Sequence, residues 1–326
     1  GVILAESQRF RMEKQLICSE IDVECLLSER LANDYFVEES LPYTKLDFNF
    51  VPNKKLKLSR TIHPHPFIPA PGNMEESCEE IFSIQVAALA QRLHQTHISK
   101  LVLGISGGLD STLALMVAVK AMDKLGLDRK NIHGLTMPGF GTGQRTYRNA
   151  NDLMKSLGVS TKEIDIKAAC TQHFKDIGHD ASVHDATYEN TQARERTQIL
   201  MDYANKIQAL VVGTGNLSEL ALGWATYNGD HMSMYGVNTG VPKTLVRRLL
   251  QWLAEHAADP EIKTTLLDII DTPVSPELLP LSSEGKVSQM TEEAIGPYEL
   301  HDFFLFYLLR YGFRPKKILF LATQAF

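Results

Sequence analysis

The fold is decided by the stretch Leu101-Val102-Leu103-Gly104-Ile105-Ser106-Gly107-Gly108-Leu109-Asp110-Ser111. It opens with a continuous apolar run, which is typical of a strand buried on both faces of a parallel sheet. The glycines that follow indicate a turn, and the spacing of Leu113, Met116 and Val117 predicts a helix after it. The sequence therefore predicts a strand, a tight loop and a helix in immediate succession.

The same alternation continues along the chain. Further strands are expected at 132–137, near 163–166 and at 209–212, and further helices at 75–95, around 150–157 and at 192–206. This pattern indicates an α/β fold, a doubly wound, mostly parallel sheet with helices on both faces. Because ligands of such sheets bind at the carboxyl ends of the strands, we expect the functional site at that edge.

Residues 1–73 follow a different pattern. A helix is expected around 23–27 and an alternating strand at 47–51, and four prolines between residues 61 and 72 favour an extended connector. We therefore divide the chain into residues 1–73 and an α/β domain over 74–326. The chain begins with Gly1 and ends at Phe326 inside a helical pattern, so we expect it to be a piece of a longer protein.

Composition excludes several classes of protein. With 326 residues, 44% hydrophobic and 22% charged, the chain has an ordinary globular composition. A net charge of -6 argues against sequence-independent binding of nucleic acid. No apolar run approaches the roughly 18 residues of a membrane span, and the start has no signal-peptide pattern. The four cysteines form no CxxC and are expected to be reduced, so we predict a cytoplasmic protein with neither nucleic acid nor membrane as partner.

The loop after the first strand has the composition of an anion-binding cradle. Gly107 and Gly108 let backbone N–H groups approach a ligand, and the helix start behind them favours negative charge. Ser106 and Ser111 add hydroxyl groups. Asp110 would repel a bare phosphate, so its presence predicts a bridging Mg²⁺. An ordinary helix start explains Asp110 or Ser111 singly but not the whole set.

A second glycine-containing segment, residues 211–218, is similar to the dinucleotide fingerprint of redox enzymes. Its third glycine is replaced by Ser218, and no strand ending in an acid follows at the required distance. A redox Rossmann protein is therefore the weaker alternative, and Ser218 is interpreted instead as opening a helix that carries Glu219.

The loop 106–111 resembles the signature of the N-type ATP pyrophosphatases, or PP-loop enzymes, which adenylate an acceptor with ATP and release pyrophosphate. Longer blocks resemble the glutamine-dependent NAD synthetase family within that group. They occur in the family's order at residues 137–143, 189–196, 213–230, 240–244 and 275–278. The resemblance covers most of residues 75–313 and implies an adenine nucleotide alpha hydrolase-like fold.

The resemblance also implies a reaction. Such enzymes use ATP and Mg²⁺ to adenylate deamido-NAD (nicotinic acid adenine dinucleotide), and ammonia then displaces AMP to give NAD. Residues 1–71 resemble only the end of the family's nitrilase-like glutaminase domain, which supplies ammonia from glutamine. The glutaminase triad and the carboxyl-terminal segment of relatives have no counterpart in the sequence, so this chain is expected to use free ammonia. A homodimer through the synthetase domain is implied as well.

Matching positions carry the implied roles. Catalysis is implied for Asp110, Lys243 and Asp230. ATP binding is implied for Ser106, Gly107, Gly108, Leu109, Asp110, Ser111, Thr214, Lys243 and Ser275. Binding of deamido-NAD is implied for Asn190, Arg194, Glu219, Trp224, Thr226, Tyr227 and Asp230. Asp110 and Glu219 are the implied metal ligands, and for Glu219 a metal contact and a substrate contact both remain open.

Lys243 is expected on the loop that follows the Gly-Val-Pro turn, at a helix start. A cation is disfavoured there by the helix dipole, which points to an anionic partner. The alternatives are another PP-loop enzyme, such as a GMP synthetase, and a nucleotide-binding module without turnover. Asp110, Glu219 and Lys243 together argue against the module, because a binder has no need to stabilise departing pyrophosphate.

Overall fold

The structure is a computed structural model that describes residues 3–31, 33, 44, 46–47, 49, 58–273, 275, 278–279 and 291–326. The chain divides into two units. Residues 67–302 form an α/β unit, and residues 1–66 together with 303–326 form the second unit.

The α/β unit is built on parallel strands in the order β3-β2-β1-β4-β5. The strands are β1 (Leu101–Gly104), β2 (Ile132–Thr136), β3 (Ser160–Glu163), β4 (Leu210–Gly213) and β5 (Tyr235–Gly236). β1 lies at the centre, with Leu101 opposite Ile132 on one side and Leu210 on the other. The strand order reverses between β1 and β4, which is where sheets of this kind bind ligands. The predicted α/β fold with a parallel sheet is confirmed.

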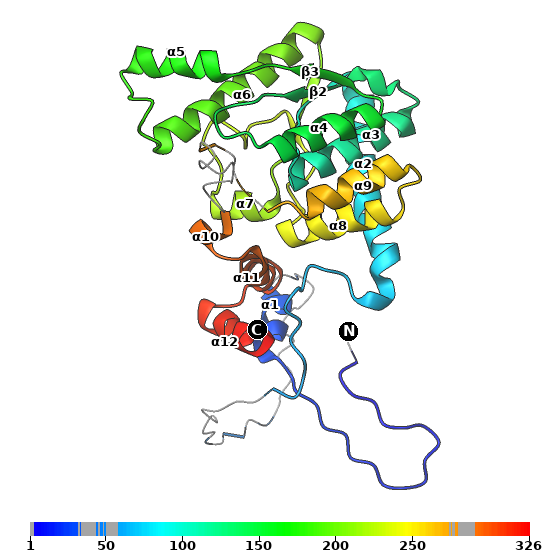
Figure 1. The fold of residues 1–326 in the computed structure, drawn as a ribbon. Coiled ribbons are helices and arrows are strands. Elements are labelled where there is room, and N and C mark those ends of the chain that lie inside the picture. Colours follow the sequence, from blue (N-terminus) through cyan, green and yellow to red (C-terminus); the bar gives the residue numbers. More distant parts are fainter. Residues whose placement is uncertain are drawn as a thin grey trace. The chain divides into compact units, whose positions relative to one another are not determined.

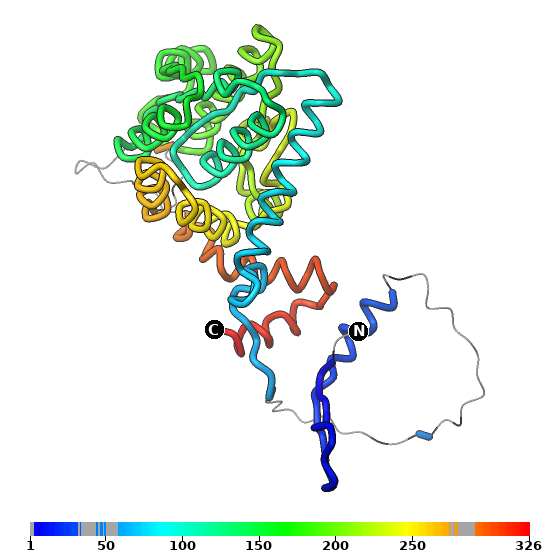
Figure 2. The backbone as a smooth tube through the Cα atoms, turned by 90° about the vertical axis from the view of Figure 1, so that its right-hand side faces the viewer, coloured from blue at the N-terminus to red at the C-terminus, as the bar shows by residue number. Residues whose placement is uncertain are grey.

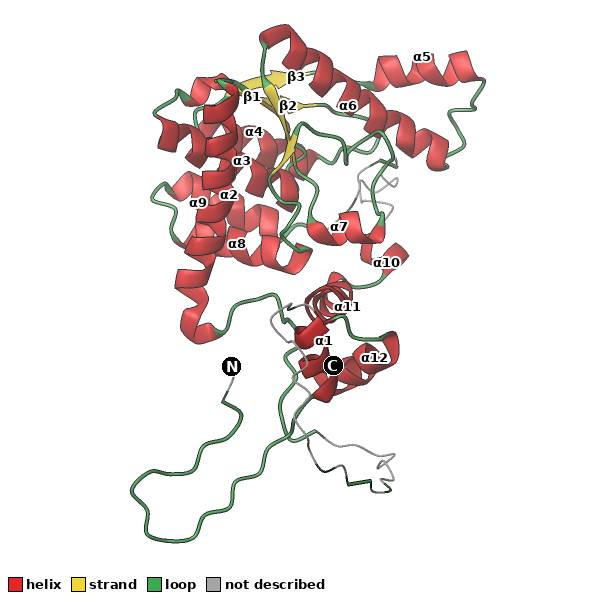
Figure 3. Ribbon diagram, turned by 180° about the vertical axis from the view of Figure 1, so that it is seen from behind, coloured by secondary structure: helices red, strands yellow, loops and turns green. Residues whose placement is uncertain are grey.

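Helices cover both faces of this sheet (Figures 1 and 3). The first layer contains α2 (Met74–Thr96), α3 (Leu109–Leu125), α4 (Gln144–Ser156), α8 (Lys243–Glu255) and α9 (Pro260–Ile270). The second contains α5 (Lys167–Ile177) and α6 (Ala186–Ile207). Leu101 and Leu103 belong to the core of the first layer and Val102 to the core of the second, as the alternation of side chains along a strand requires.

The outer strands differ from their sequence-based prediction. β3 covers residues 160–163 instead of 163–166, because an edge strand with exposed side chains has no apolar pattern to reveal it. The predicted residues follow the strand, and Ile164 N and Ile166 N donate to Thr136 O and Pro138 O beside β2. β5 is only two residues long, too short for any periodic pattern.

The short helix α7 (Leu217–Leu222) begins one residue earlier than expected. Its cap is Asn216, whose side chain accepts a hydrogen bond from Glu219 N. The prediction that Ser218 opens this helix is therefore wrong, because Asn216 provides the capping oxygen that helix starts favour. Two further elements complete the unit, α10 (Thr291–Ile295) and the first residues of α11 (Tyr298–Tyr311).

The second unit contains α1 (Val23–Leu31), the rest of α11 and α12 (Pro315–Ala325). Its core includes Ile62, Phe303, Phe313 and Ile318. Residues 3–22 contain no helix or strand, and their dark blue tube doubles back on itself in Figure 2. The helix expected around 23–27 is confirmed, whereas most of the strand expected at 47–51 lies outside the described residues. Residues 61–70 have neither helix nor strand, and a single 3₁₀ turn follows at Pro71–Asn73.

Within the described residues, no helix has the length and apolar character needed to cross a membrane. All four cysteines are free thiols. Cys78 and Cys170 are fully buried in the α/β unit, and Cys18 is exposed in the second unit.

Candidate active site

The glycine-containing loop joins the carboxyl end of β1 to α3. Gly107 has a φ of +83°, and a Cβ there would lie 2.1 Å from the carbonyl oxygen of Thr146, so only glycine fits. α3 starts with Gly108 as its cap, and no described side chain bonds to the first N–H groups of this helix. α6 and α9, by contrast, are capped by Asp185 and Asp259. The start of α3 is thus suited to an anion.

The two loop serines hold this cradle in shape. Ser106 Oγ and Ser111 Oγ lie 3.1 Å apart, and Gly108 N donates to Ser106 Oγ at 3.2 Å. Ser111 Oγ also donates to Gly108 O at 3.2 Å. The hydroxyl groups are therefore in place before any ligand binds, which reduces the entropy lost on binding.

The charged centre of the site is a lysine held between two carboxylates. Lys243 Nζ lies 2.5 Å from Asp110 Oδ2 and 2.9 Å from Glu219 Oε1. These residues come from α8, α3 and α7. Lys243 is the first residue of α8 and is only 6% exposed. The expectation that Lys243 lies on the loop is therefore wrong, because the helix begins directly after Pro242. The Lys243 side chain is buried between two carboxylates and is not exposed to solvent.

The protonation equilibria reflect this crowding. Burial, together with the nearby Asp110 carboxylate, raises the pKa of Glu219 to about 7. Burial opposes the charged form of Lys243, but Asp110 and Glu219 outweigh it and raise the pKa of the ammonium above its usual range. The ammonium also lies 5.4 Å from the centroid of the Tyr298 ring. Lys243 therefore stays charged at neutral pH, while Glu219 titrates there.

Buried amides hold Asp110 in place. Asn216 Nδ2 donates to Asp110 Oδ1 at 2.8 Å, and Asn238 Nδ2 donates to the carbonyl oxygens of Asp110 and Thr214, each at 3.0 Å. Gln85 Nε2 in turn donates to Asn238 Oδ1 at 3.1 Å. The sequence reasoning missed these residues. Asn216 has a detectable signal, an Asn directly before a helix, whereas Asn238 and Gln85 have none.

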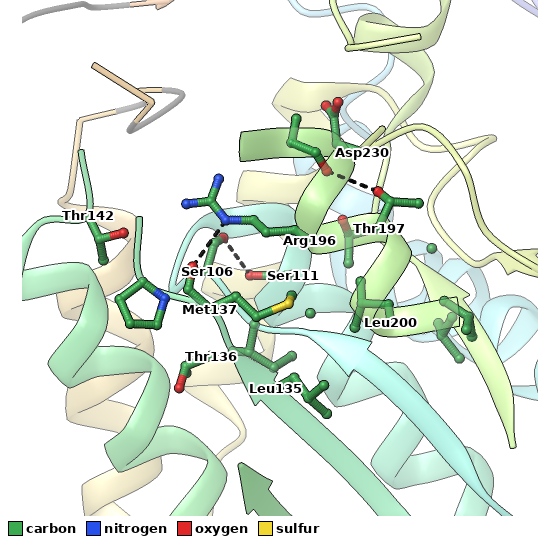
Figure 4. Close-up of a pocket in the computed structure, with 18 of the residues that line it drawn as sticks. Ser106, Ser111, Leu135, Thr136, Met137, Thr142, Arg196, Thr197, Leu200 and Asp230 are labelled. Carbon is green, nitrogen blue, oxygen red and sulfur yellow. Dashed lines mark hydrogen bonds between the residues drawn. The ribbon is translucent and has the colours of Figure 1, made fainter. Parts of the chain in front are cut away.

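Two cavities meet at this edge of the sheet. One, of about 270 Å³, lies at the ends of β1, β2 and β4 and has mostly apolar walls that include Leu135, Met137 and Leu200 (Figure 4). The other, of about 200 Å³, contains the charged centre. Ser106 and Asp230 line both cavities. An apolar chamber joined to a charged one suits a ligand with a flat ring at one end and phosphates at the other.

Most of the predicted site residues are brought together here. The charged cavity is lined by Ser106, Gly108, Leu109, Asp110, Glu219, Trp224, Asp230, Lys243 and Ser275. The apolar cavity is lined by Ser106, Ser111, Thr214 and Asp230. It also contains Arg196, which the sequence reasoning did not single out and whose Nε donates to Met137 O at 3.1 Å.

The other predicted substrate contacts line neither cavity, and they hold the loop around residues 224–231 in shape. Thr226 N donates to Asp230 Oδ1 at 2.8 Å, and Thr226 Oγ1 donates to Asn190 Oδ1 at 2.8 Å. Arg194 Nε donates to Tyr227 O at 3.0 Å. Tyr227 itself is 74% exposed. Asp230 is thus oriented by its loop toward the junction of the cavities.

A parallel sheet with a glycine cradle at its switch point, next to a lysine between two carboxylates, defines a nucleotide-binding α/β protein of the PP-loop type. Residues 81–320 match the NAD synthase family, and the chain belongs to that family.

Related proteins agree with this assignment. The chain is 44% identical over 340 residues to the glutamine-dependent NAD(+) synthetase of Mycobacterium leprae. This match covers 100% of this chain and 50% of that protein. It is 33% identical to the Synechocystis enzyme of the same name, over 74% of this chain and 40% of that protein. The chain therefore spans about half the length, or less, of the curated relatives it matches.

Solved structures have the same fold. A glutamine-dependent NAD+ synthetase from Acinetobacter baumannii, in complex with adenosine diphosphate, matches with a TM-score of 0.55 and 25% identity, over 76% of this chain and 43% of that chain. An NMN synthetase from Francisella tularensis matches with a TM-score of 0.59 and 24% identity, over 76% of this chain and 94% of that chain.

Proposed function

We propose that this chain catalyses the ATP-dependent amidation of deamido-NAD to NAD through an adenylated intermediate, with release of AMP and pyrophosphate. Ammonia is the nitrogen donor, supplied from glutamine in a longer protein. The observation that carries the proposal is the ammonium of Lys243 held between Asp110 and Glu219 in the charged cavity, which shares Ser106 and Asp230 with the apolar cavity. The names of the matching relatives support the choice of reaction.

The two cavities support a placement for ATP. Adenine suits the apolar chamber, because its walls bury a flat ring and the Arg196 stem lies along it. The triphosphate then extends toward the start of α3 and the loop 106–111, where the helix dipole and the hydroxyl groups favour anions. The bound ADP of the Acinetobacter enzyme is consistent with an adenine nucleotide here.

A magnesium ion fits the donor set. Mg²⁺ prefers one or two carboxylates together with phosphate oxygens and water, and Asp110 and Glu219 already share one cation, the ammonium of Lys243. We propose that these carboxylates hold the metal and that the Lys243 ammonium beside them contacts the phosphates. When bound, the ion neutralises charge on the phosphate oxygens.

The chain's own residues have separate tasks in this reaction. A carboxylate oxygen of deamido-NAD attacks the α-phosphorus of ATP, and the bond between the α-phosphorus and the bridging oxygen of pyrophosphate breaks. Lys243 offsets the negative charge that grows on the leaving pyrophosphate. Ammonia then attacks the adenylated carbonyl and AMP leaves. Asp230, fixed by Thr226 N, is placed to accept the proton that ammonium loses before it attacks.

We further propose that the nicotinate end of deamido-NAD binds beside Trp224, Thr226 and Tyr227, with Asn190 and Arg194 supporting that loop. Trp224 lines the charged cavity, which supports a ring stacked against it. The 74% exposure of Tyr227 supports a second copy of the chain, or the dinucleotide itself, covering this surface. Pairing as a homodimer is therefore part of the proposal.

The decisive experiment measures which acceptor triggers cleavage of ATP to AMP and pyrophosphate in the presence of Mg²⁺ and ammonium. Deamido-NAD should do so, and XMP, aspartate and citrulline should not. Nicotinic acid mononucleotide belongs in the panel because one structural neighbour is an NMN synthetase. Turnover with XMP but not with deamido-NAD would favour a GMP synthetase. Binding of ATP without pyrophosphate release from any acceptor would favour a non-catalytic module.

A further inference from the structure

We propose that Asp302 is a positioning residue that sets the place of the Lys243 ammonium. Asp302 lies in the first turns of α11 and is only 2% exposed. Its carboxylate accepts hydrogen bonds from Ser218 Oγ, from Thr244 N at 2.9 Å and from Thr244 Oγ1 at 2.6 Å. The inference rests on the proposed function, because that function gives Lys243 its task.

The start of α8 depends on this carboxylate. The cap position of the helix is Pro242, whose side chain makes no capping hydrogen bond. Lys243 N donates instead to Ser218 Oγ at 2.9 Å, and Thr244 N donates to Asp302. Ser218 and Asp302 thus supply from outside what a capping side chain ordinarily supplies, and a negative charge suits this end of a helix.

The same network fixes two of the three charged residues of the site. Ser218 directly precedes Glu219 on α7, and Lys243 is the first residue of α8. Because Asp302 binds Ser218 and Thr244 together, it holds α7 and α8 in one register. Tyr298, which precedes Asp302 by one helical turn on α11, places its ring near the Lys243 ammonium. Lys243 is therefore held at its backbone and at its charged end.

Asp302 lines neither cavity, so it acts through Lys243 and not on the substrate. The ammonium contacts at 2.5 and 2.9 Å leave little tolerance. A displacement of about 1 Å in a positioned group can cost on the order of 10²-fold in rate. Loss of Asp302 should therefore slow adenylation while leaving the acceptor site intact.

The test compares Asp302→Asn with Asp123→Asn. Asp123 pairs with Arg129 at 2.7 Å near the other end of α3, which makes it a matched carboxylate-to-amide control. With ATP, deamido-NAD and ammonium, Asp302→Asn should lower kcat for AMP formation by about 10- to 100-fold. KM for deamido-NAD should change by less than about twofold. Asp123→Asn should retain the parent kcat.

A double-mutant cycle with Lys243→Met separates positioning from a general structural role. If Asp302 acts through Lys243, Asp302→Asn should cost almost nothing further once the ammonium is gone. An equal loss of kcat in both backgrounds, or a parent kcat for Asp302→Asn alone, would overturn the proposal. Should Asp302→Asn fail to fold, Ser218→Ala removes the same bridge and should show the same non-additivity.

A measurement without substrate keeps this inference distinct from the proposed function. Trace acetylation followed by mass spectrometry gives the reactivity of Lys243 relative to the exposed Lys120. Asp302→Asn should label Lys243 severalfold faster than the parent, and Asp123→Asn should not. If no acceptor triggers ATP cleavage, the proposed function fails and labelling alone decides: faster labelling supports positioning, and unchanged labelling overturns it.

Discussion

At the scale of single residues, the environment of Lys243 differs most clearly from what its local sequence predicts. An isolated lysine at a helix start reads as an exposed charge, yet it is buried and bound by two carboxylates. Lys243→Met retains length and apolar bulk but removes the charge. We expect kcat for AMP formation to fall by about 10²–10³. Binding of deamido-NAD, measured by calorimetry without ATP, should stay close to the parent value.

The control for this substitution is Lys120→Met, which removes an exposed lysine from α3 and should leave kcat unchanged. A normal kcat for Lys243→Met with a much weaker Kd for deamido-NAD would assign the lysine to the acceptor instead of the leaving group.

Glu219 gives a prediction about pH. Its folded pKa of about 7 lies above the usual 4.5, so the folded protein binds the extra proton. Stability from this proton is fully present below pH 4.5 and is lost as the pH rises through 7. In metal-free buffer, the unfolding free energy of the parent should therefore fall by roughly 2–3 kcal/mol relative to that of Glu219→Gln as the pH rises from 5 to 7.5. Urea unfolding at several pH values measures this, and parallel curves for parent and variant would contradict it.

Sequence reasoning at this scale depends on a signal that is contiguous in the chain. The loop 106–111 places its serines, glycines and acid side by side, so its chemistry is readable directly. Asp302 and Asn238 act through contacts with segments distant in the sequence, and no local pattern marks such a residue. The buried state of Lys243 was missed for the same reason: its partners Asp110 and Glu219 come from other helices.

At the scale of elements, burial decided which strands could be predicted. β1 and β4 are buried on both faces and show as continuous apolar runs. β3 lies at an edge with exposed side chains and was displaced in the prediction. Helices α2, α3 and α4 of the first layer and α6 of the second were predicted, whereas no residue range was predicted for α8 or α9. The start of α7 was misplaced because it depends on its cap, Asn216.

Two glycines with a positive φ flank α3, and together they allow a matched test of the turn between β1 and α3. Gly107→Ala forces a Cβ to within 2.1 Å of Thr146 O at a positive φ, so we expect loss of pyrophosphate release and a lower melting temperature. Gly126→Ala is the matched control, because Gly126 also has a positive φ but no atom lies within 4 Å of its Cβ. It should cost about 1–2 kcal/mol in stability and retain activity. Equal activity in the two variants would show that the loop tolerates displacement.

At the scale of the whole molecule, the cysteines report on the two units separately. Cys18 and Cys25 lie in the second unit, and Cys78 and Cys170 are fully buried in the α/β unit. Burial also raises the pKa of the Cys170 thiol to about 11, which suppresses the reactive thiolate. In pulsed alkylation with rising urea, Cys18 should be labelled in native buffer, and Cys78 and Cys170 only when the α/β unit unfolds.

Mg²⁺ and ATP should shift the labelling of Cys78 and Cys170 to higher urea, because a ligand that binds only the folded unit stabilises it. The labelling of Cys18 serves as the internal reference and should not move. Labelling of Cys78 or Cys170 in native buffer at the rate of Cys18 would contradict the buried core.

The wide separation of Asp110 and Lys243 along the chain has a consequence during protein synthesis. The two residues are 133 positions apart, so at about 5–20 residues per second the ribosome needs roughly 7–27 seconds between them. Throughout that interval the nascent chain carries a glycine cradle and an acid without the lysine that balances it. Asp302, the hydrogen-bond partner of Ser218, lies 84 positions after it and is therefore synthesised later still. The emerging polypeptide therefore cannot form the complete set of contacts around Lys243 until translation has passed the start of α11.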